Sequence, residues 1–440
     1  MTALLRRLAA ASPLAPDAAG YEVDWTGRVR GRALAVALPR SADEVAAVLR
    51  TCAEEGVGVT VRGGGTGLVA GAVPDGTVVL ATSRLDGLGP VEDGTVVAGA
   101  GTTLAALQAH ARAAGSEYGV DMASRDSATV GGTVATNAGG LHVVAHGTTR
   151  AQVLGVEAVL ADASVVRRLD GLVKDATGYD LGHLLVGSEG TLGVVTAVRV
   201  RLVPPPAGRE TVLVGLDGVE AAVDLVARAR RGARGLRAAE LLLADGLALV
   251  REATGLPAPL RGAHPVLLLL EAEEGLAGVV EDVPEAAVAL DAADAARLWA
   301  YREGLTEALS RRGVPHKLDV SLPARALAPF LADLPSATGR HEVHVFGHVG
   351  DGNLHVNVLG PAPDDDAVDE AVLRLAAAHG GSIGAEHGVG RLKRRYLPLS
   401  RTPAELAAMR AVKAALDPAG LLGPGVLLPD PAPGVQTPAS

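Results

Sequence analysis

The fold is decided around residues 59–67, which read Val59-Thr60-Val61-Arg62-Gly63-Gly64-Gly65-Thr66-Gly67. The alternating apolar residues at its start predict a strand, and the glycines predict a loop directly after it. Consecutive N–H groups with no side chains in the way can form a nest for a pyrophosphate. The stretch has neither the G-x-G-x-x-G spacing of a dinucleotide fingerprint nor the Gly-Lys-Ser/Thr of a Walker loop. Taken alone, it fits a plain tight turn about as well as an anion site.

Two further glycine-bearing blocks follow in the same half of the chain. Residues 121–140 read Asp-Met-Ala-Ser-Arg-Asp-Ser-Ala-Thr-Val-Gly-Gly-Thr-Val-Ala-Thr-Asn-Ala-Gly-Gly. Residues 187–195 read Gly-Ser-Glu-Gly-Thr-Leu-Gly-Val-Val. Three such blocks imply that the backbone repeatedly comes close to one long, flat ligand. A dinucleotide fits this arrangement better than a single phosphate does.

A histidine-rich run lies in the other half, over residues 344–357 (His-Val-Phe-Gly-His-Val-Gly-Asp-Gly-Asn-Leu-His-Val-Asn). Its two alternating runs flank a turn, so the sequence predicts a hairpin in which His348 and His355 face each other, roughly 5 Å apart. Two imidazoles at that separation can bind one divalent metal. Glu386 could add a carboxylate ligand, and the adjacent His387 a titratable base. Single histidines on strands are usually structural, but this combination favours a site.

The composition narrows the class of protein. The chain has 440 residues, enough for two or three domains, and it is 48% hydrophobic but only 2% aromatic, so Ala, Val and Leu must form its core. A net charge of −10 without a long basic tract argues against nucleic acid as a partner. The single cysteine, Cys52, excludes an intrachain disulfide and indicates a reducing, cytoplasmic setting, with peripheral membrane attachment as the alternative. No stretch predicts a transmembrane segment.

The first domain is expected to span residues 1–205 and to end at a stiff run of three prolines, 204–206. Its pattern predicts a mixed sheet with helices between the strands. One helix is expected to start at a capping box formed by Ser41 and Glu44 and to reach about Glu55. Strands are expected at 34–38, 57–62, 77–80, 95–99, 155–160 and 194–202.

A second α+β domain is expected over residues 206–395, where the pattern restarts. The last segment, 396–440, is expected to pack back on the first domain and to end in a disordered, proline-rich tail over 429–440. The expected strands are 211–215, 238–243, 265–271 and 316–321, followed by the histidine hairpin, and the expected helices are 218–232, 245–253, 292–312, 367–379 and 403–416.

Four motifs together resemble one family, although each alone is unspecific. They are Arg-Gly-Gly-Gly-Thr-Gly (62–67), Val-Gly-Gly-Thr-Val-Ala-Thr-Asn-Ala-Gly-Gly (130–140), Gly-His-Val-Gly-Asp-Gly-Asn-Leu-His (347–355) and Glu-His-Gly-Val-Gly (386–390). The first half resembles the FAD-binding domain of the vanillyl-alcohol-oxidase-like, p-cresol methylhydroxylase (PCMH)-type flavoproteins. The second half resembles the C-terminal domain of FAD-linked oxidases, especially the D-lactate, glycolate and D-2-hydroxyglutarate dehydrogenases. The likeness covers nearly the whole chain.

The resemblance implies an α+β fold: a PCMH-type FAD-binding domain of two α+β subdomains, followed by a mixed α+β substrate domain. It also implies noncovalent FAD, because Thr66 and Gly67 stand where relatives that tether flavin covalently often have a histidine. The expected cofactor-binding residues are Arg62, Gly63, Gly64, Gly65, Thr66, Gly67, Asp121, Ser127, Thr129, Gly131, Gly132, Thr133, Asn137, Gly140 and Val195.

The same resemblance points to residues that would bind a substrate carboxylate. Arg302 and Thr306 are four residues apart, so they share one face of the expected helix. Arg offers a planar carboxylate two parallel hydrogen bonds, and Lys offers a point charge. The expected substrate-binding residues are Arg302, Thr306, Lys317 and Asn357.

These residues predict an FAD- and divalent-metal-dependent dehydrogenase that oxidises a D-2-hydroxy acid to the 2-oxo acid by hydride transfer to flavin. His387 is the expected general base, and His348, His355 and Glu386 are the expected metal ligands. The acid (D-2-hydroxyglutarate, D-lactate or glycolate), the metal (zinc, manganese or iron) and the oligomeric state stay open. Without a NAD(P) fingerprint, a quinone or an electron-transfer protein is the expected electron acceptor. The alternatives are a non-catalytic flavin subunit of a larger oxidoreductase complex and a metal-only hydrolase or lyase.

Overall fold

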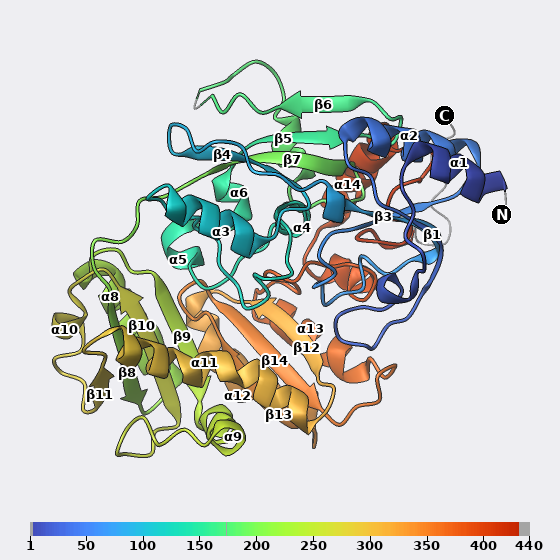
Figure 1. Ribbon diagram of the computed structural model, residues 1–440. Helices are drawn as coiled ribbons and strands as arrows, with labels where there is room; N and C mark the ends of the chain where they lie inside the picture. Colours follow the sequence, from blue (N-terminus) through green and yellow to red (C-terminus); the bar gives the residue numbers. More distant parts are fainter. Residues whose placement is uncertain (1–2, 173, 431–440) are drawn as a thin grey trace.

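The computed structural model describes residues 3–172 and 174–430 (Figure 1). Its first part contains a parallel sheet in which β3 (Asp75–Ala81) lies between β1 (Arg32–Ala37) and β2 (Val59–Arg62). An antiparallel sheet follows, in the order β4 (Thr95–Gly99), β7 (Val194–Arg201), β5 (Val153–Val159) and β6 (Val165–Arg168). The helices of this part are α1 (Ala3–Ala11), α2 (Ala42–Glu54), α3 (Leu104–Ala113), α4 (Val130–Thr136), α5 (Val143–His146), α6 (Thr149–Gln152) and α7 (Leu181–Leu185).

Helix α2 begins where the sequence predicts it. The Ser41 side chain accepts a hydrogen bond of 3.2 Å from the N–H of Glu44, which satisfies one of the free donors of the first turn. The second half of the expected capping box differs, because the Glu44 carboxylate accepts from the N–H of Arg40, at 2.9 Å, rather than from that of Ser41. One cap bond is sufficient to fix the start of the helix.

The second part is built on one antiparallel sheet. Its strand order is β11 (Ala286–Val288), β8 (Glu210–Leu216), β10 (Val266–Ala272), β9 (Ala238–Leu243), β13 (Glu342–Gly347), β14 (Asn353–Leu359) and β12 (His316–Ser321). Together the three sheets and their helices confirm the expected α+β fold class.

The two faces of this large sheet have different partners. On one face, Leu354 and Val356 belong to a core that includes Phe330 of α12 (Leu327–Thr338). Helices α8 (Val219–Gly232), α10 (Leu276–Val279) and α13 (Ala367–Ala378) also cover this face. On the other face, Phe346 packs in a core with Leu305 of α11 (Ala292–Arg312) and with residues of α9 (Ala244–Thr254). Because side chains alternate along a strand, the odd-numbered residues of β14 point to this second face.

The histidine hairpin forms, but its register differs from the expected one. Phe346, not His348, lies opposite His355, and β13 ends at Gly347. His348 lies in the turn, where its carbonyl accepts the N–H of Asp351 at 3.1 Å. A shift of two residues keeps the same side-chain face, since the strand period is two, and the rings of His348 and His355 still lie 5.2 Å apart.

The segment after the second part returns to the first. Helix α14 (Pro403–Leu416) begins at a complete capping box of Thr402 and Glu405 (Figure 1). Its Val412 and Leu416 pack against the core of the antiparallel sheet. Its Lys413 ammonium donates to the carbonyls of Thr191 and Leu422, at 2.7 and 2.8 Å. Leu422 in turn is fully buried in the core of the parallel sheet. The expected disordered tail, 429–440, lies from 431 onward outside the described residues.

No helix in the described ranges combines the length and the apolar character needed to cross a bilayer.

The C-terminal segment is expected to contribute to the stability of the first part. Leu422→Ala should lower the free energy of unfolding by about 2–5 kcal/mol, because it opens a cavity in the core of the parallel sheet. Urea unfolding followed by fluorescence and circular dichroism measures this loss. Leu172→Ala, at a side chain that is 59% exposed, is the matched control and should change stability by less than about 0.5 kcal/mol. Equal stability of the two variants would contradict the packing described above.

Candidate active site

A cavity of about 620 Å³ lies between the glycine-rich loops of the first part and the β12–β14 face of the second. It brings together every residue expected to bind substrate or metal and the expected base. Those residues are Arg302, Thr306, Lys317, His348, His355, Asn357, Glu386 and His387. The expected cofactor residues that line it are Gly63, Gly64, Gly65, Thr66, Gly67, Ser127, Thr129, Gly131, Gly132, Thr133, Gly140 and Val195.

The loop at 63–67 fits the pyrophosphate of FAD. Within the part of the chain that the structure describes, none of its five backbone N–H groups donates to a protein acceptor. Gly64 must be glycine, because a Cβ there would lie 1.8 Å from the carbonyl oxygen of Ser127. Gly65 has a φ of 71°, in the left-handed region that favours glycine. A row of free N–H groups on a cavity wall suits an anionic group.

Three expected cofactor residues do not line the cavity. The Arg62 guanidinium donates to backbone carbonyls of the segment 20–23 at 3.2–3.3 Å. Asp121 forms an ion pair with Arg125, with a closest distance of 2.6 Å. Asn137 ends α4 in a left-handed conformation, with a φ of 50°. The side chains of all three support the loops around the cavity instead of facing it.

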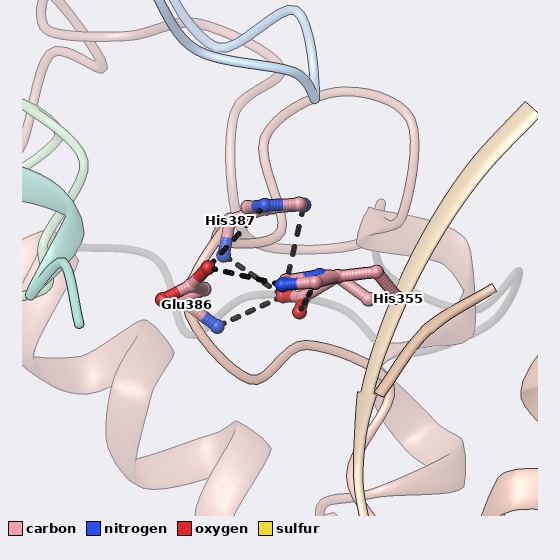
Figure 2. Close-up of side chains that lie close together, drawn as sticks. His355, Glu386 and His387 are labelled. Carbon is pink, nitrogen blue, oxygen red and sulfur yellow. Dashed lines mark hydrogen bonds and ion pairs between the residues drawn. The ribbon is translucent and has the colours of Figure 1, made fainter. Parts of the chain in front are cut away.

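Three histidines converge on the carboxylate of Glu386. The Nε2 atoms of His348, His355 and His387 lie 3.8, 3.6 and 3.7 Å from Glu386 Oε1. Figure 2 shows the rings of His355 and His387 nearly parallel beside this carboxylate, and their centroids are 5.3 Å apart. The cluster therefore joins the hairpin to the segment after α13, as the sequence predicts.

Two buried carboxylates lie behind these histidines, on the side of their Nδ1 atoms. Glu240 Oε1 of β9 lies 2.6 Å from His348 Nδ1. Asp319 of β12 lies 3.5 Å from His355 Nδ1 and 3.8 Å from His387 Nδ1. The Glu240 carboxylate is within hydrogen-bond distance of His348 and orients its ring, with Nε2 facing the cluster. Asp319 lies beyond hydrogen-bond distance of the other two Nδ1 atoms and acts on those rings through its charge.

The charges within the cluster shift its pKa values. Burial alone would raise the pKa of Glu240, but His348 and Arg302 outweigh it and lower that pKa to about 2. Burial lowers the pKa of His348, and the Glu240 carboxylate outweighs this effect and raises it to about 9. Burial lowers the pKa of His387 below its usual value, against the opposing charges of Asp319 and Glu386. His387 is therefore available as a neutral base at physiological pH.

The donor set at this end of the cavity fits a divalent metal. Ligand atoms around one zinc ion, at 2.0–2.1 Å from it, lie roughly 3.4 Å apart, close to the spacings around Glu386. Among the described residues, the donor atoms that all lie within 4.8 Å of one another belong to Asp319, His355, Glu386 and His387, a group that includes His387 and leaves out His348. The oxygens of Asp319 already accept the Asn353 amide and the three N–H groups of 385–387, whereas Nε2 of His348 accepts no hydrogen bond among the described residues.

Lys317 and Asn357 form a second cross-strand pair on the sheet face that carries the histidine cluster. They are directly paired across β12 and β14, two residues along from the pair Asp319 and His355. Two residues of a strand span roughly 7 Å. The sheet thus separates the histidine cluster from a cation and an amide by about the length of a small organic acid.

Sequence reasoning missed Asp319, Glu240 and Trp25, which lines the mouth of the cavity. Asp319 stands two residues after Lys317, so strand alternation places both on one face. Glu240 is a lone acid inside an otherwise apolar strand, and such a residue is rarely buried without a partner. Nothing in the residues around Trp25 indicates that it approaches the second part of the chain.

Comparison with known proteins agrees with this architecture. The model of the family "FAD linked oxidases, C-terminal domain" matches residues 205–427, and that of the "FAD binding domain" matches residues 33–168. Among solved structures, 4-ethylphenol oxidase from Gulosibacter chungangensis has a TM-score of 0.77 at 16% identity, over 97% of this chain and 96% of that chain. p-Cresol methylhydroxylase has a TM-score of 0.76 at 14% identity, over 96% and 95%. Both confirm the PCMH-type fold.

Curated relatives match more than nine tenths of this chain and more than three quarters of their own length. The mitochondrial D-2-hydroxyglutarate dehydrogenase of Bos taurus is 39% identical over 431 residues, which cover 92% of this chain and 79% of the relative. The D-2-hydroxyglutarate dehydrogenase of Xanthomonas citri pv. viticola is 39% identical over 441 residues, covering 93% and 92%. The resemblance inferred from the motifs is confirmed, and the chain belongs to the family of FAD-linked oxidases.

Proposed function

We propose that the protein is an FAD- and divalent-metal-dependent dehydrogenase that oxidises a D-2-hydroxy acid to the 2-oxo acid, with a diacid of the D-2-hydroxyglutarate type favoured over D-lactate and glycolate. One observation carries the proposal: the cluster of His348, His355, Glu386 and His387 shares a single cavity with the free N–H groups of the loop at 63–67. The names and the high coverage of the relatives support the same substrate class.

The residues of the second part bind and orient the acid. Arg302 approaches the cavity from α11, and its Nε is fixed by Glu240 at 2.7 Å, which leaves other N–H groups of the guanidinium for a substrate carboxylate. Lys317 and Asn357 suit a second polar end of the substrate, one row further along the sheet. This spacing favours a diacid over a three-carbon acid.

His387 removes the hydroxyl proton. Its Nε2 points toward the cluster, while Asp319 faces its Nδ1 and stabilises the imidazolium that forms. The loop at 63–67 would hold FAD, which would supply the hydride acceptor for the oxidation. A divalent metal held by His348, His355 and Glu386 would act as a Lewis acid toward the hydroxyl oxygen. We expect noncovalent FAD, a quinone or electron-transfer protein as electron acceptor, and a cytoplasmic location.

The substrate class is tested by anaerobic reduction of the flavin. D-2-Hydroxyglutarate, D-lactate and glycolate, together with the L-enantiomers of the chiral acids, are each mixed with the holoenzyme, and the loss of flavin absorbance is followed. The D-diacid should reduce the flavin fastest, and prior metal removal by a chelator should slow reduction by orders of magnitude. Reduction by L-acids only, or full activity after verified metal removal, would refute the proposal. Protein without a flavin spectrum would favour a metal-only hydrolase or lyase.

His387→Asn tests the base. The variant should keep FAD and metal but reduce the flavin about 10²- to 10⁴-fold more slowly, because no group then accepts the hydroxyl proton. Stopped-flow absorbance gives the rate, and elemental analysis gives the metal content. His379→Asn, outside the cavity lining, is the control and should behave as wild type. Loss of metal from His387→Asn would instead make His387 a ligand.

Glu240→Gln tests the carboxylate behind His348. Its removal should weaken metal binding about 10- to 100-fold, because His348 loses the partner that orients its ring. Metal titration followed by calorimetry measures the change, with thermal unfolding as a check on folding. Glu252→Gln, at a side chain that is 71% exposed, is the control and should leave metal affinity unchanged. Unchanged affinity in folded Glu240→Gln would remove Glu240 from this role.

A further inference from the structure

A tight turn over residues 23–30, in the first part of the chain, reaches the cavity through Trp25. Val23 and Arg30 form an antiparallel bridge, and Asp24, only 5% exposed, accepts the N–H of Val29 at 3.0 Å. Gly27 closes the turn with a φ of 74°. These bonds fix the backbone on both sides of Trp25, whose side chain lines the cavity yet is 50% exposed. Trp25 therefore lies at the boundary between the cavity and solvent.

Arg28 fastens this turn to the second part of the chain. Its guanidinium donates to the carbonyl of Pro363 at 3.2 and 2.9 Å and lies 3.7 Å from the Asp369 carboxylate. It also lies 3.2 Å from His316 Nδ1, at the start of β12. Several contacts to a different sheet hold the turn in place, so the position of Trp25 is set by the second part as well as by the first.

Trp25 covers Lys317, the residue after His316. The Lys317 ammonium lies 4.7 Å from the centroid of the Trp25 ring, within the range of a cation–π interaction. In the described part of the chain, no carboxylate lies within ion-pair distance of this ammonium. Arg302, by contrast, is already paired with Glu240 at 2.7 Å. Lys317 is thus a cavity cation that has an aromatic face but no anionic partner.

We propose that Trp25 is a specificity-determining residue, which shields Lys317 from water and so selects substrates that carry a second carboxylate. The inference rests on the proposed function and adds to it a residue from the cofactor-binding part of the chain. In an extended five-carbon diacid the two carboxylates lie about 5 Å apart, since each C–C bond is about 1.5 Å. Such a molecule can reach from the histidine cluster toward Lys317 and Asn357. A three-carbon acid has no second carboxylate that could bind Lys317.

The selectivity has a simple electrostatic cause. A carboxylate attracts an ammonium more strongly where water is excluded, because the local dielectric constant is lower. Burial already lowers the pKa of Lys317. A bound carboxylate would restore the lost solvation of the ammonium, and the indole would keep solvent from competing with it. Removal of the ring should weaken diacid binding selectively.

The kinetic test compares the ratio of kcat/KM for D-2-hydroxyglutarate to that for D-lactate. Trp25→Ala should lower this ratio about 5- to 30-fold, mainly through KM of the diacid. Trp25→Phe, which keeps an aromatic face, should lower it less than about threefold. Arg28→Ala should also lower this kcat/KM ratio, because the turn that carries Trp25 loses its contacts with Pro363 and Asp369. Tyr179→Ala, at an exposed aromatic residue outside the cavity, is the control.

A binding test works without turnover and so separates this inference from the proposed function. The chain has two tryptophans, and Trp299→Phe leaves Trp25 as the single indole reporter. Glutarate should change the Trp25 emission of the holoenzyme in a saturable way, and propionate at equal ionic strength should not. Lys317→Met in this background should abolish the glutarate response.

The outcomes are distinct. An equal loss of kcat/KM for both acids in Trp25→Ala, or no loss, would overturn the selectivity role, as would equal fluorescence responses to glutarate and propionate. Should Trp25→Ala fail to fold, Arg28→Ala and the fluorescence titration still decide the matter. If no hydroxy acid reduces the wild-type flavin while glutarate still binds through Lys317, the proposed function fails and the anion site stands.

Discussion

The carboxylate of Asp319 is the constraint on which the geometry of the site depends. It is fully buried on β12, and one of its oxygens accepts the N–H groups of Ala385, Glu386 and His387, at 2.8–3.0 Å. These bonds tie the segment that carries Glu386 and His387 to the sheet that carries His355. The same side chain faces the Nδ1 atoms of both His355 and His387. A neutral side chain could not supply as many strong hydrogen-bond acceptor sites at a position that is fully buried from water.

A second carboxylate holds the same segment from the opposite side. Glu189, in the glycine block of the first part, accepts the N–H groups of Val389 and Gly390 at 2.8 and 2.7 Å. Burial raises the pKa of Glu189, against these two hydrogen bonds. A Cβ at Gly390 would lie 2.1 Å from the carbonyl oxygen of Val69, which explains the glycine there. The turn after His387 is therefore fixed by both parts of the chain, and neither alone defines the site.

The sequence predicts much of the second part of the fold, although it misses helix α12 and strand β11. Strands such as 238–243 and 316–321 and helices such as 292–312 and 403–416 have the expected bounds, because apolar periodicity and caps are local signals. The first part is predicted less completely. The second and third residues of helix α4 are glycines, which have a low helix propensity, so the sequence does not predict a helix there. The Thr129 cap and packing against the neighbouring loops stabilise it instead.

The site residues with reactive side chains could be predicted from the sequence. The buried carboxylates that position them could not. His348, His355, Glu386 and His387 stand in motifs whose chemistry is visible in the sequence. Glu240 lies 108 residues before His348, its hydrogen-bond partner, and no local pattern joins residues so far apart. The predicted hairpin register is wrong for a related reason, since the length of the turn after Gly347 decides which residues pair. Long-range pairing and loop closure are properties of the folded chain rather than of any one segment.

The return of the C-terminal segment has a consequence for biosynthesis. Strand β2, which leads into the glycine loop at 63–67, is flanked by Leu421 and Gly423: the N–H of Val59 donates to Leu421, and its carbonyl accepts from Gly423. Ribosomes deliver a chain from its N-terminus, and early domains usually fold first. Here the glycine loop lacks these neighbours until residues 421–423 have been translated, roughly 350 residues after the loop itself. Formation of the loop in its final surroundings is thus coupled to synthesis of residues 421–423, and a fragment that ends before them would leave β2 without these two hydrogen bonds.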